Sequence, residues 1–67
     1  MKEVGKILRE KRIELGYSQS NLAKIGGIKR ETLKNVELMK RRFSVKNLKK
    51  VLNAMKLNVK EILRELF

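Results

Sequence analysis

Apolar residues in this 67-residue chain recur every three or four positions, in five short segments separated by glycines or helix-capping residues. That spacing puts apolar side chains on one face of an α-helix, whereas a strand needs strict alternation. The chain has no proline and only four glycines, so little in it interrupts helices. We therefore predict an all-α fold over residues 1–67, a single domain built as a compact five-helix bundle.

Capping signals set the expected helix boundaries. Gly16 is a C-terminal glycine for the first helix, and Ser18, Ser44 and Asn58 are suitable N-caps for later ones. The expected helices, in chain order, cover about residues 2–15, 18–25, 29–38, 44–57 and 58 onward. The pattern predicts an all-helical domain with short connections.

The apolar stripe of the first expected helix contains a charge. Val4, Leu8 and Leu15 lie on the stripe, flanked by Ile7, and Arg12 lies between Leu8 and Leu15. A cation at such a position needs an anionic partner. The alternative is that its long side chain reaches solvent along the helix surface.

Composition excludes most catalytic chemistry. The chain has neither Cys nor His, which removes disulfides, thiolate or imidazole metal sites and Ser-His or Cys-His nucleophiles. All seven acidic residues are Glu, and they form no metal-ligand cluster. We expect no enzyme activity, no metal, no cofactor and no small-molecule ligand. No stretch approaches the roughly 18 apolar residues of a membrane span, so we expect no membrane association and a cytoplasmic location.

Positive charge is the strongest compositional signal. Eighteen Lys and Arg oppose seven acidic residues, a formal net charge of +11. Residues 24–60 hold 12 of the basic residues and two of the acidic ones. Such a segment suits a polyanion, because binding phosphates releases counterions. A basic membrane-surface peptide is the weaker interpretation, because turns and caps divide the chain into short helices.

The centre of the sequence has the spacing of two helices crossing through a tight turn. Such a crossing needs a small residue at the contact, here Ala23, and a turn residue that tolerates positive φ, here Gly27. Ile28, Leu33 and Val36 follow at positions that face back toward the core. The outer face of the second of these helices is then polar.

At this point the chain resembles the helix-turn-helix family of phage repressor and Cro proteins, the XRE-type regulators. The resemblance covers about residues 4–63, with the helix-turn-helix at about 19–38. It rests on the joint spacing of Arg12, Leu15-Gly16, Ser18-Gln19, Leu22-Ala23, Gly27-Ile28, Thr32-Leu33, Val36-Glu37 and the helix at 44–57. It implies a lambda-repressor-like bundle that binds double-stranded DNA in a sequence-specific way and regulates transcription, most simply as a repressor.

The resemblance also implies roles for individual positions. The helix at about 29–37 would lie in the major groove. Its base-reading positions are occupied by Arg30, Glu31 and Asn35. The positions near the DNA backbone are occupied by Gln19, Lys29, Lys34, Lys40, Arg41 and Arg42. Structural roles fall to Ala23, Gly27 and an ion pair between Arg12 and Glu37, since family members commonly pair those two positions.

The residue types suit these roles. Arg30 can form a bidentate pair with guanine, Asn35 can pair with adenine, and Glu31 can accept from the cytosine amine. The alternative is a solvated helix face with an ion pair between Glu31 and Lys34, three positions apart.

Four positions depart from the family pattern. Gly26 replaces a branched apolar residue before the turn glycine, and Lys29 replaces the usual Ser or Thr cap. Met39 and Phe43 replace the usual Gly and Pro of the following loop. We expect a looser turn, a longer third helix, and Phe43 packed in the core.

The resemblance further implies a homodimer on a palindromic operator, because one reading helix covers few base pairs. The apolar residues near the end of the sequence are the dimer candidates: Ile62, Leu63, Leu66 and Phe67. Ordinary core packing is the alternative for them. A further alternative for the whole chain is a helix-turn-helix-fold interaction module, or an autoregulating antitoxin, whose main role is to bind a partner protein.

Overall fold

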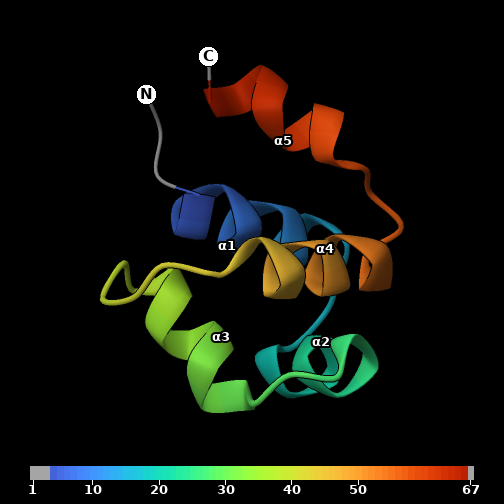
Figure 1. Cartoon of the computed structure of the whole chain (residues 1–67). Coiled ribbons are helices and arrows are strands. Elements are labelled where there is room, and N and C mark those ends of the chain that lie inside the picture. Colours follow the sequence, from blue (N-terminus) through green and yellow to red (C-terminus); the bar gives the residue numbers. More distant parts are fainter. Residues whose placement is uncertain (1–3, 67) are drawn as a thin grey trace.

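The computed structural model describes the backbone of residues 4–66 and the side chains of residues 4–62 and of Arg64. Within that part the chain forms five α-helices and no strand (Figure 1). They are α1 (Val4–Glu14), α2 (Gln19–Gly26), α3 (Arg30–Glu37), α4 (Val45–Ala54) and α5 (Val59–Leu66). Figure 1 shows α2 and α3 at one end of the bundle, α5 at the other, and α1 and α4 between them. The predicted all-α, five-helix fold is confirmed.

Three predicted N-caps are confirmed by hydrogen bonds to the helix they precede. Ser18 Oγ accepts from the Asn21 amide at 3.0 Å, at the start of α2. Ser44 Oγ accepts from the Asn47 amide at 3.1 Å, and Asn58 Oδ1 from the Glu61 amide at 3.1 Å. Each bond satisfies a backbone donor that the first helical turn leaves without an intrahelical partner.

Helix ends differ from the prediction by a few residues. The placement of Leu15 on the buried stripe is wrong: α1 ends at Glu14, and Leu15 lies in the following turn, 49% exposed. The second helix continues through Gly26 instead of stopping at Ile25. The fourth helix ends at Ala54, before the predicted end, because the chain enters the left-handed region at residue 56 with φ 59°.

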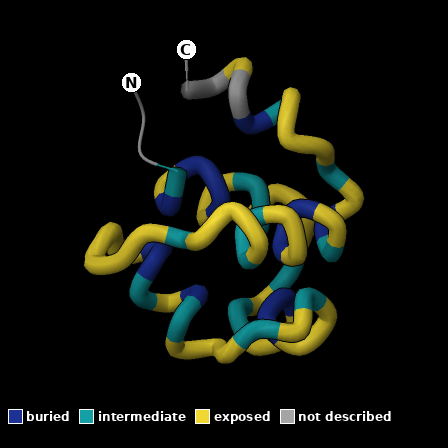
Figure 2. Tube along the Cα trace, viewed as in Figure 1, coloured by how far each residue is buried: buried dark blue, intermediate teal, exposed yellow. Residues whose placement is uncertain are grey.

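Among the described residues, the buried hydrophobic cluster lies between the helices and consists of aliphatic side chains and one methionine. Its buried residues are Ile7, Leu8, Leu22, Ala23, Leu33, Val36, Val51, Leu52, Met55 and Ile62. Phe43, from the loop after α3, is half-buried against this cluster, as predicted. Figure 2 shows buried positions interspersed along the helices, with exposed segments at the α2–α3 turn and along the loop after α3.

Helix α1 approaches the backbone of α3 at Gly5, which is buried. A β-carbon at this position would lie 1.9 Å from the carbonyl oxygen of Val36 and 2.9 Å from its carbonyl carbon. Only a residue without a side chain fits such a contact. Gly5 therefore lets α1 pack directly on the last turn of α3 and hold that helix in place.

Candidate nucleic-acid interface

The connection between α2 and α3 is a tight turn closed by backbone hydrogen bonds, which we call the closed turn. Gly27 has φ 71°, and its amide donates to the carbonyl oxygens of Ala23 and Lys24. The Ile28 amide donates to Ala23 at 3.0 Å. Together these bonds form a Schellman-type helix end, which favours glycine at the left-handed position. The predicted roles of Gly27 and of the buried contact residue Ala23 are consistent with this geometry, and the looser turn expected from Gly26 is not observed.

Helix α3 separates its residues into two faces. Leu33 and Val36 are buried in the core. On the opposite side, Arg30, Glu31 and Lys34 are exposed. Asn35, the third predicted base-reading residue, is half-buried. The fold thus presents the first turn of α3 to solvent most completely, which is the part that a recognition helix directs at base edges.

Both ends of α3 differ from the usual arrangement. Lys29 occupies the N-cap position in an extended conformation and makes no side-chain cap hydrogen bond. At the other end, Met39 has φ 61° and the backbone amide of Lys40 donates to the backbone carbonyl oxygen of Asn35 at 2.9 Å. The longer third helix that was expected is therefore wrong, because the chain turns left-handed at Met39 and α3 ends at Glu37.

Glu37 is the buried charged residue of the described core, 5% exposed. Arg12 forms a bidentate ion pair with it: Nε donates to Oε2 at 2.8 Å and Nη2 to Oε1 at 2.9 Å. The Nη1 group of Arg12 donates to the Tyr17 carbonyl oxygen at 2.9 Å. The predicted Arg12–Glu37 pair is present in the structure, and it ties α1, the α1–α2 connection and α3 together.

Gln19 joins the same cluster, which the sequence did not indicate. Its Nε2 donates to Glu37 Oε1 at 3.0 Å, across 18 positions of sequence. The side chain at the first position of α2 is therefore half-buried beside the end of α3. No local sequence pattern predicts this contact, because the contact depends on the angle at which α2 crosses α3.

The electrostatics of this end of the molecule are strongly positive. All six basic residues between positions 29 and 42 are exposed: Lys29, Arg30, Lys34, Lys40, Arg41 and Arg42. The same segment holds two acidic residues, and Arg12 neutralises one of them, Glu37. Among the described residues, no ion pair links Glu31 to Lys34. The cations of α3 and of the loop after it are consequently available to an anionic partner.

The C-terminal dimer candidates divide into two groups. Ile62 is 1% exposed and packs in the core of its own chain, so the expectation that it contacts a partner is wrong. The side chains of Leu63 and Leu66, and all of Phe67, lie outside the described residues.

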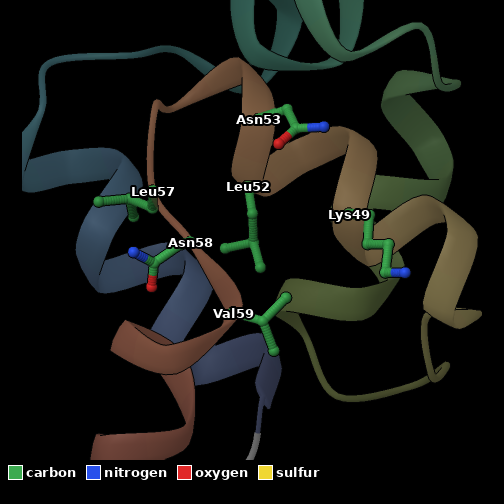
Figure 3. A pocket seen from close by; sticks show the side chains of 6 residues that line it. All are labelled: Lys49, Leu52, Asn53, Leu57, Asn58 and Val59. Carbon is green, nitrogen blue, oxygen red and sulfur yellow. The ribbon is translucent and has the colours of Figure 1, made fainter.

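A groove of about 250 Å³ lies where α4 meets α5 (Figure 3). It is lined by Lys49, Leu52, Asn53, Leu57, Asn58 and Val59. One of its polar groups, the Asn58 side-chain oxygen, already caps α5. Within the described part of the chain no three acidic residues gather as metal ligands, and none of its helices is long and apolar enough to cross a bilayer.

Comparison with known proteins places this geometry in context. The family model described as helix-turn-helix matches residues 8–62. The restriction-modification controller protein C.AhdI from Aeromonas hydrophila has 33% sequence identity, and the match covers 90% of this chain and 91% of that chain with a TM-score of 0.85. A point mutant of the controller protein C.Esp1396I has 20% identity, with coverage of 96% and 83% and a TM-score of 0.90, a likeness that shows the fold. Among curated proteins, none matches the sequence significantly.

Proposed function

Because the chain belongs to the helix-turn-helix family, we propose that it is a sequence-specific regulator of transcription that reads duplex DNA with α3. The observation that carries the proposal is the exposed cationic face of α3 and its loop, held outward by the closed turn at Gly27. Such a protein acts by binding and not by catalysis. We place it in the cytoplasm, most simply as a repressor that occludes a promoter.

Base recognition falls to the outer face of α3. Arg30 is exposed at the first position of α3 and suits guanine, whose two major-groove acceptors match a guanidinium fork. Glu31 accepts only, so it suits the cytosine amine, and Asn35 suits adenine. Each correct pair contributes about 1–3 kcal/mol of discrimination.

The remaining cations hold the duplex without reading it. Lys29 and Lys34 flank the base-reading residues, and Lys40, Arg41 and Arg42 extend the positive surface along the loop. Contacts from lysine and arginine to phosphate fix register and orientation, and they weaken as salt rises. The uncapped N-terminus of α3 leaves backbone donors free near Lys29, where an anion is favoured.

We propose further that the operator is palindromic and is bound by a homodimer. Eight residues of α3 extend about 12 Å, which spans only three or four base pairs. Two copies related by a two-fold axis would read half-sites about one helical turn apart. Sedimentation with and without the operator tests this: two protomers per palindrome are expected, and a single protomer bound to one half-site with full affinity contradicts it.

The experiment that tests the proposal begins with selection of bound sequences from a random DNA pool, followed by titration at several salt concentrations. We expect a specific site bound about 10³-fold or more over random DNA, with a steep salt dependence. Arg30→Ala should lose about 1–3 kcal/mol and relax preference at one base position, whereas Lys34→Ala should weaken all sequences alike and reduce the salt slope by about 1.

Two matched variants control this experiment. Arg30→Lys keeps the charge but loses the guanidinium fork, so it should relax the same base position while retaining the salt slope. Lys60→Ala removes an exposed charge on α5, at the opposite end of the bundle (Figure 1), and should change neither. Absence of any enriched site, or unchanged base preference in Arg30→Ala, would contradict the proposed reading face.

A further inference from the structure

We propose that Glu37 is a positioning residue for DNA binding: fixed by Arg12, its carboxylate holds the Gln19 amide so that the remaining N–H of Nε2 is presented to a DNA phosphate. This proposal rests on the proposed function, since it concerns the same interface. It assigns to the buried cluster between α1, α2 and α3 a part in phosphate recognition beyond holding the fold.

The first step is the rigidity of the carboxylate. Arg12 occupies both oxygens of Glu37 through a fork of two hydrogen bonds, at 2.8 and 2.9 Å. The two side chains are 11% and 1% exposed, so water competes little for these bonds. A bidentate guanidinium–carboxylate pair fixes orientation as well as distance. Glu37 therefore offers one remaining acceptor direction on Oε1, and Gln19 takes it.

The second step is the orientation of the Gln19 amide. Its nitrogen donates to Glu37 Oε1 at 3.0 Å. The reversed amide would place a carbonyl oxygen against a carboxylate oxygen, two acceptors without a proton between them. Glu37 thus selects one of the two amide orientations. Within the described residues the second Nε2 proton has no acceptor, so Gln19 keeps one donor for a ligand.

The third step is location. Gln19 is the first residue of α2, next to the Ser18 cap, and the network ends on the last residue of α3. A helix N-terminus carries partial positive charge, which favours a phosphate beside the amide donor. Without Glu37 a half-buried glutamine would sample both amide orientations and several rotamers, and binding would have to order it.

The experiment uses operator duplexes that carry a single neutral methylphosphonate at each backbone position in turn. The wild type should lose about tenfold in affinity at one phosphate per half-site, in line with a hydrogen bond to a charged group. Gln19→Leu should bind the unmodified operator about tenfold more weakly and be indifferent to that substitution. Arg12→Lys keeps the charge but loses the fork, so it should lose most of its sensitivity at the same phosphate and keep it at the others.

Asn58→Ala is the matched control for stability. It removes the α5 cap, at the far end of the molecule from α2 and α3, and should retain full sensitivity at that phosphate despite its lower melting temperature. If Arg12→Lys is folded and remains as sensitive as the wild type, the cluster is structural only and the proposal is wrong. Equal sensitivity of Gln19→Leu and wild type at every phosphate overturns it as well.

A measurement without DNA separates this proposal from the proposed function. In the free protein, the side-chain amide of Gln19 should have an NMR order parameter close to that of rigid backbone, about 0.85. The side-chain amide of Asn21, an exposed residue two positions along the same helix, should have an order parameter below about 0.6. Equal mobility of the two amides would refute the clamp even if the protein binds an operator. An ordered Gln19 amide in a protein that selects no DNA site would refute the proposed function instead.

Discussion

Helices α3 and α4 differ in how they begin. Helix α4 has a Ser44 cap whose oxygen accepts a backbone hydrogen bond, whereas Lys29 at the corresponding position of α3 makes none. Their ends are alike, because each is followed within two residues by a non-glycine residue in the left-handed region, Met39 and Lys56. The local signals that define α4 at its start are therefore missing from α3.

What holds α3 is tertiary instead. Gly5 lets α1 contact its last turn, and the Arg12–Glu37 pair ties the same turn to α1. In the first turn, Leu33 is buried, but Arg30 and Glu31 are exposed and the helix start has no side-chain cap hydrogen bond. The ion pair and the Gly5 contact thus both act on the C-terminal end of α3, whereas the exposed cations Lys29 and Arg30 lie at its N-terminal end, which we propose that DNA approaches.

Removal of the Arg12–Glu37 ion pair should destabilise α3 more than any other change considered for the two helices. Arg12→Ala leaves the buried carboxylate of Glu37 without its partner, and we expect a loss of about 3–5 kcal/mol in the free energy of unfolding, measured by urea denaturation. Native-state hydrogen exchange should show the α3 amides losing protection before those of α4. The double variant Arg12→Met with Glu37→Leu should recover much of the loss, because it removes both charges together. A loss that is equal in the single and double variants would assign the effect to packing.

Disruption of the contact between Gly5 and the backbone of α3 should cause the second-largest loss of stability. Gly5→Ala puts a β-carbon within 1.9 Å of the Val36 carbonyl oxygen, so the two helices must separate, and we expect about 3 kcal/mol of destabilisation. Gly26→Ala is the matched control on the α2–α4 contact, where a β-carbon would meet Lys50 oxygen at 3.5 Å, an ordinary contact. That variant should be neutral or slightly stabilising, since alanine favours helix over glycine. Thermal unfolding measures both, and equal melting temperatures would contradict the close approach.

Local sequence patterns predicted most of the helices, but they did not predict most of the contacts that hold the helices together. Helix spacing and the Ser18, Ser44 and Asn58 caps predicted the helices, because these signals act within one turn. Leu15 was misplaced because periodicity does not report where a helix stops.

The candidate site divides in the same way. The exposed face of α3 and the turn at Gly27 are properties of spacing, and the Arg12–Glu37 pair followed from family resemblance. The hydrogen bond from Gln19 to Glu37 and the approach at Gly5 depend on how helices cross, which no single segment encodes. The sequence therefore predicted which residues α3 exposes to solvent better than it predicted the contacts that hold the helix in place.

Adding a cap to α3 or removing the cap of α4 should change the free energy of unfolding by an intermediate amount. Lys29→Ser supplies the missing cap on α3 and should raise the free energy of unfolding by about 1 kcal/mol, while Ser44→Ala should lower it by a similar amount. The two variants should differ in DNA binding, since Lys29→Ser also removes a cation and occupies a free backbone donor. Affinity should fall for Lys29→Ser although the protein is more stable. A more stable variant with unchanged affinity would show that the open end of α3 serves no ligand.

The smallest expected change in stability comes from the left-handed residues that follow α3 and α4. Met39 and Lys56 have φ 61° and 59°, a conformation in which a β-carbon crowds the following carbonyl oxygen. Glycine removes that strain but adds freedom to the unfolded chain, so Met39→Gly and Lys56→Gly should each gain only about 0.5 kcal/mol. Equal gains, read as melting temperature, would confine the difference between α3 and α4 to their starts. A loss in Met39→Gly alone would mean that the Met39 side chain, although 54% exposed, contributes packing that holds the end of α3.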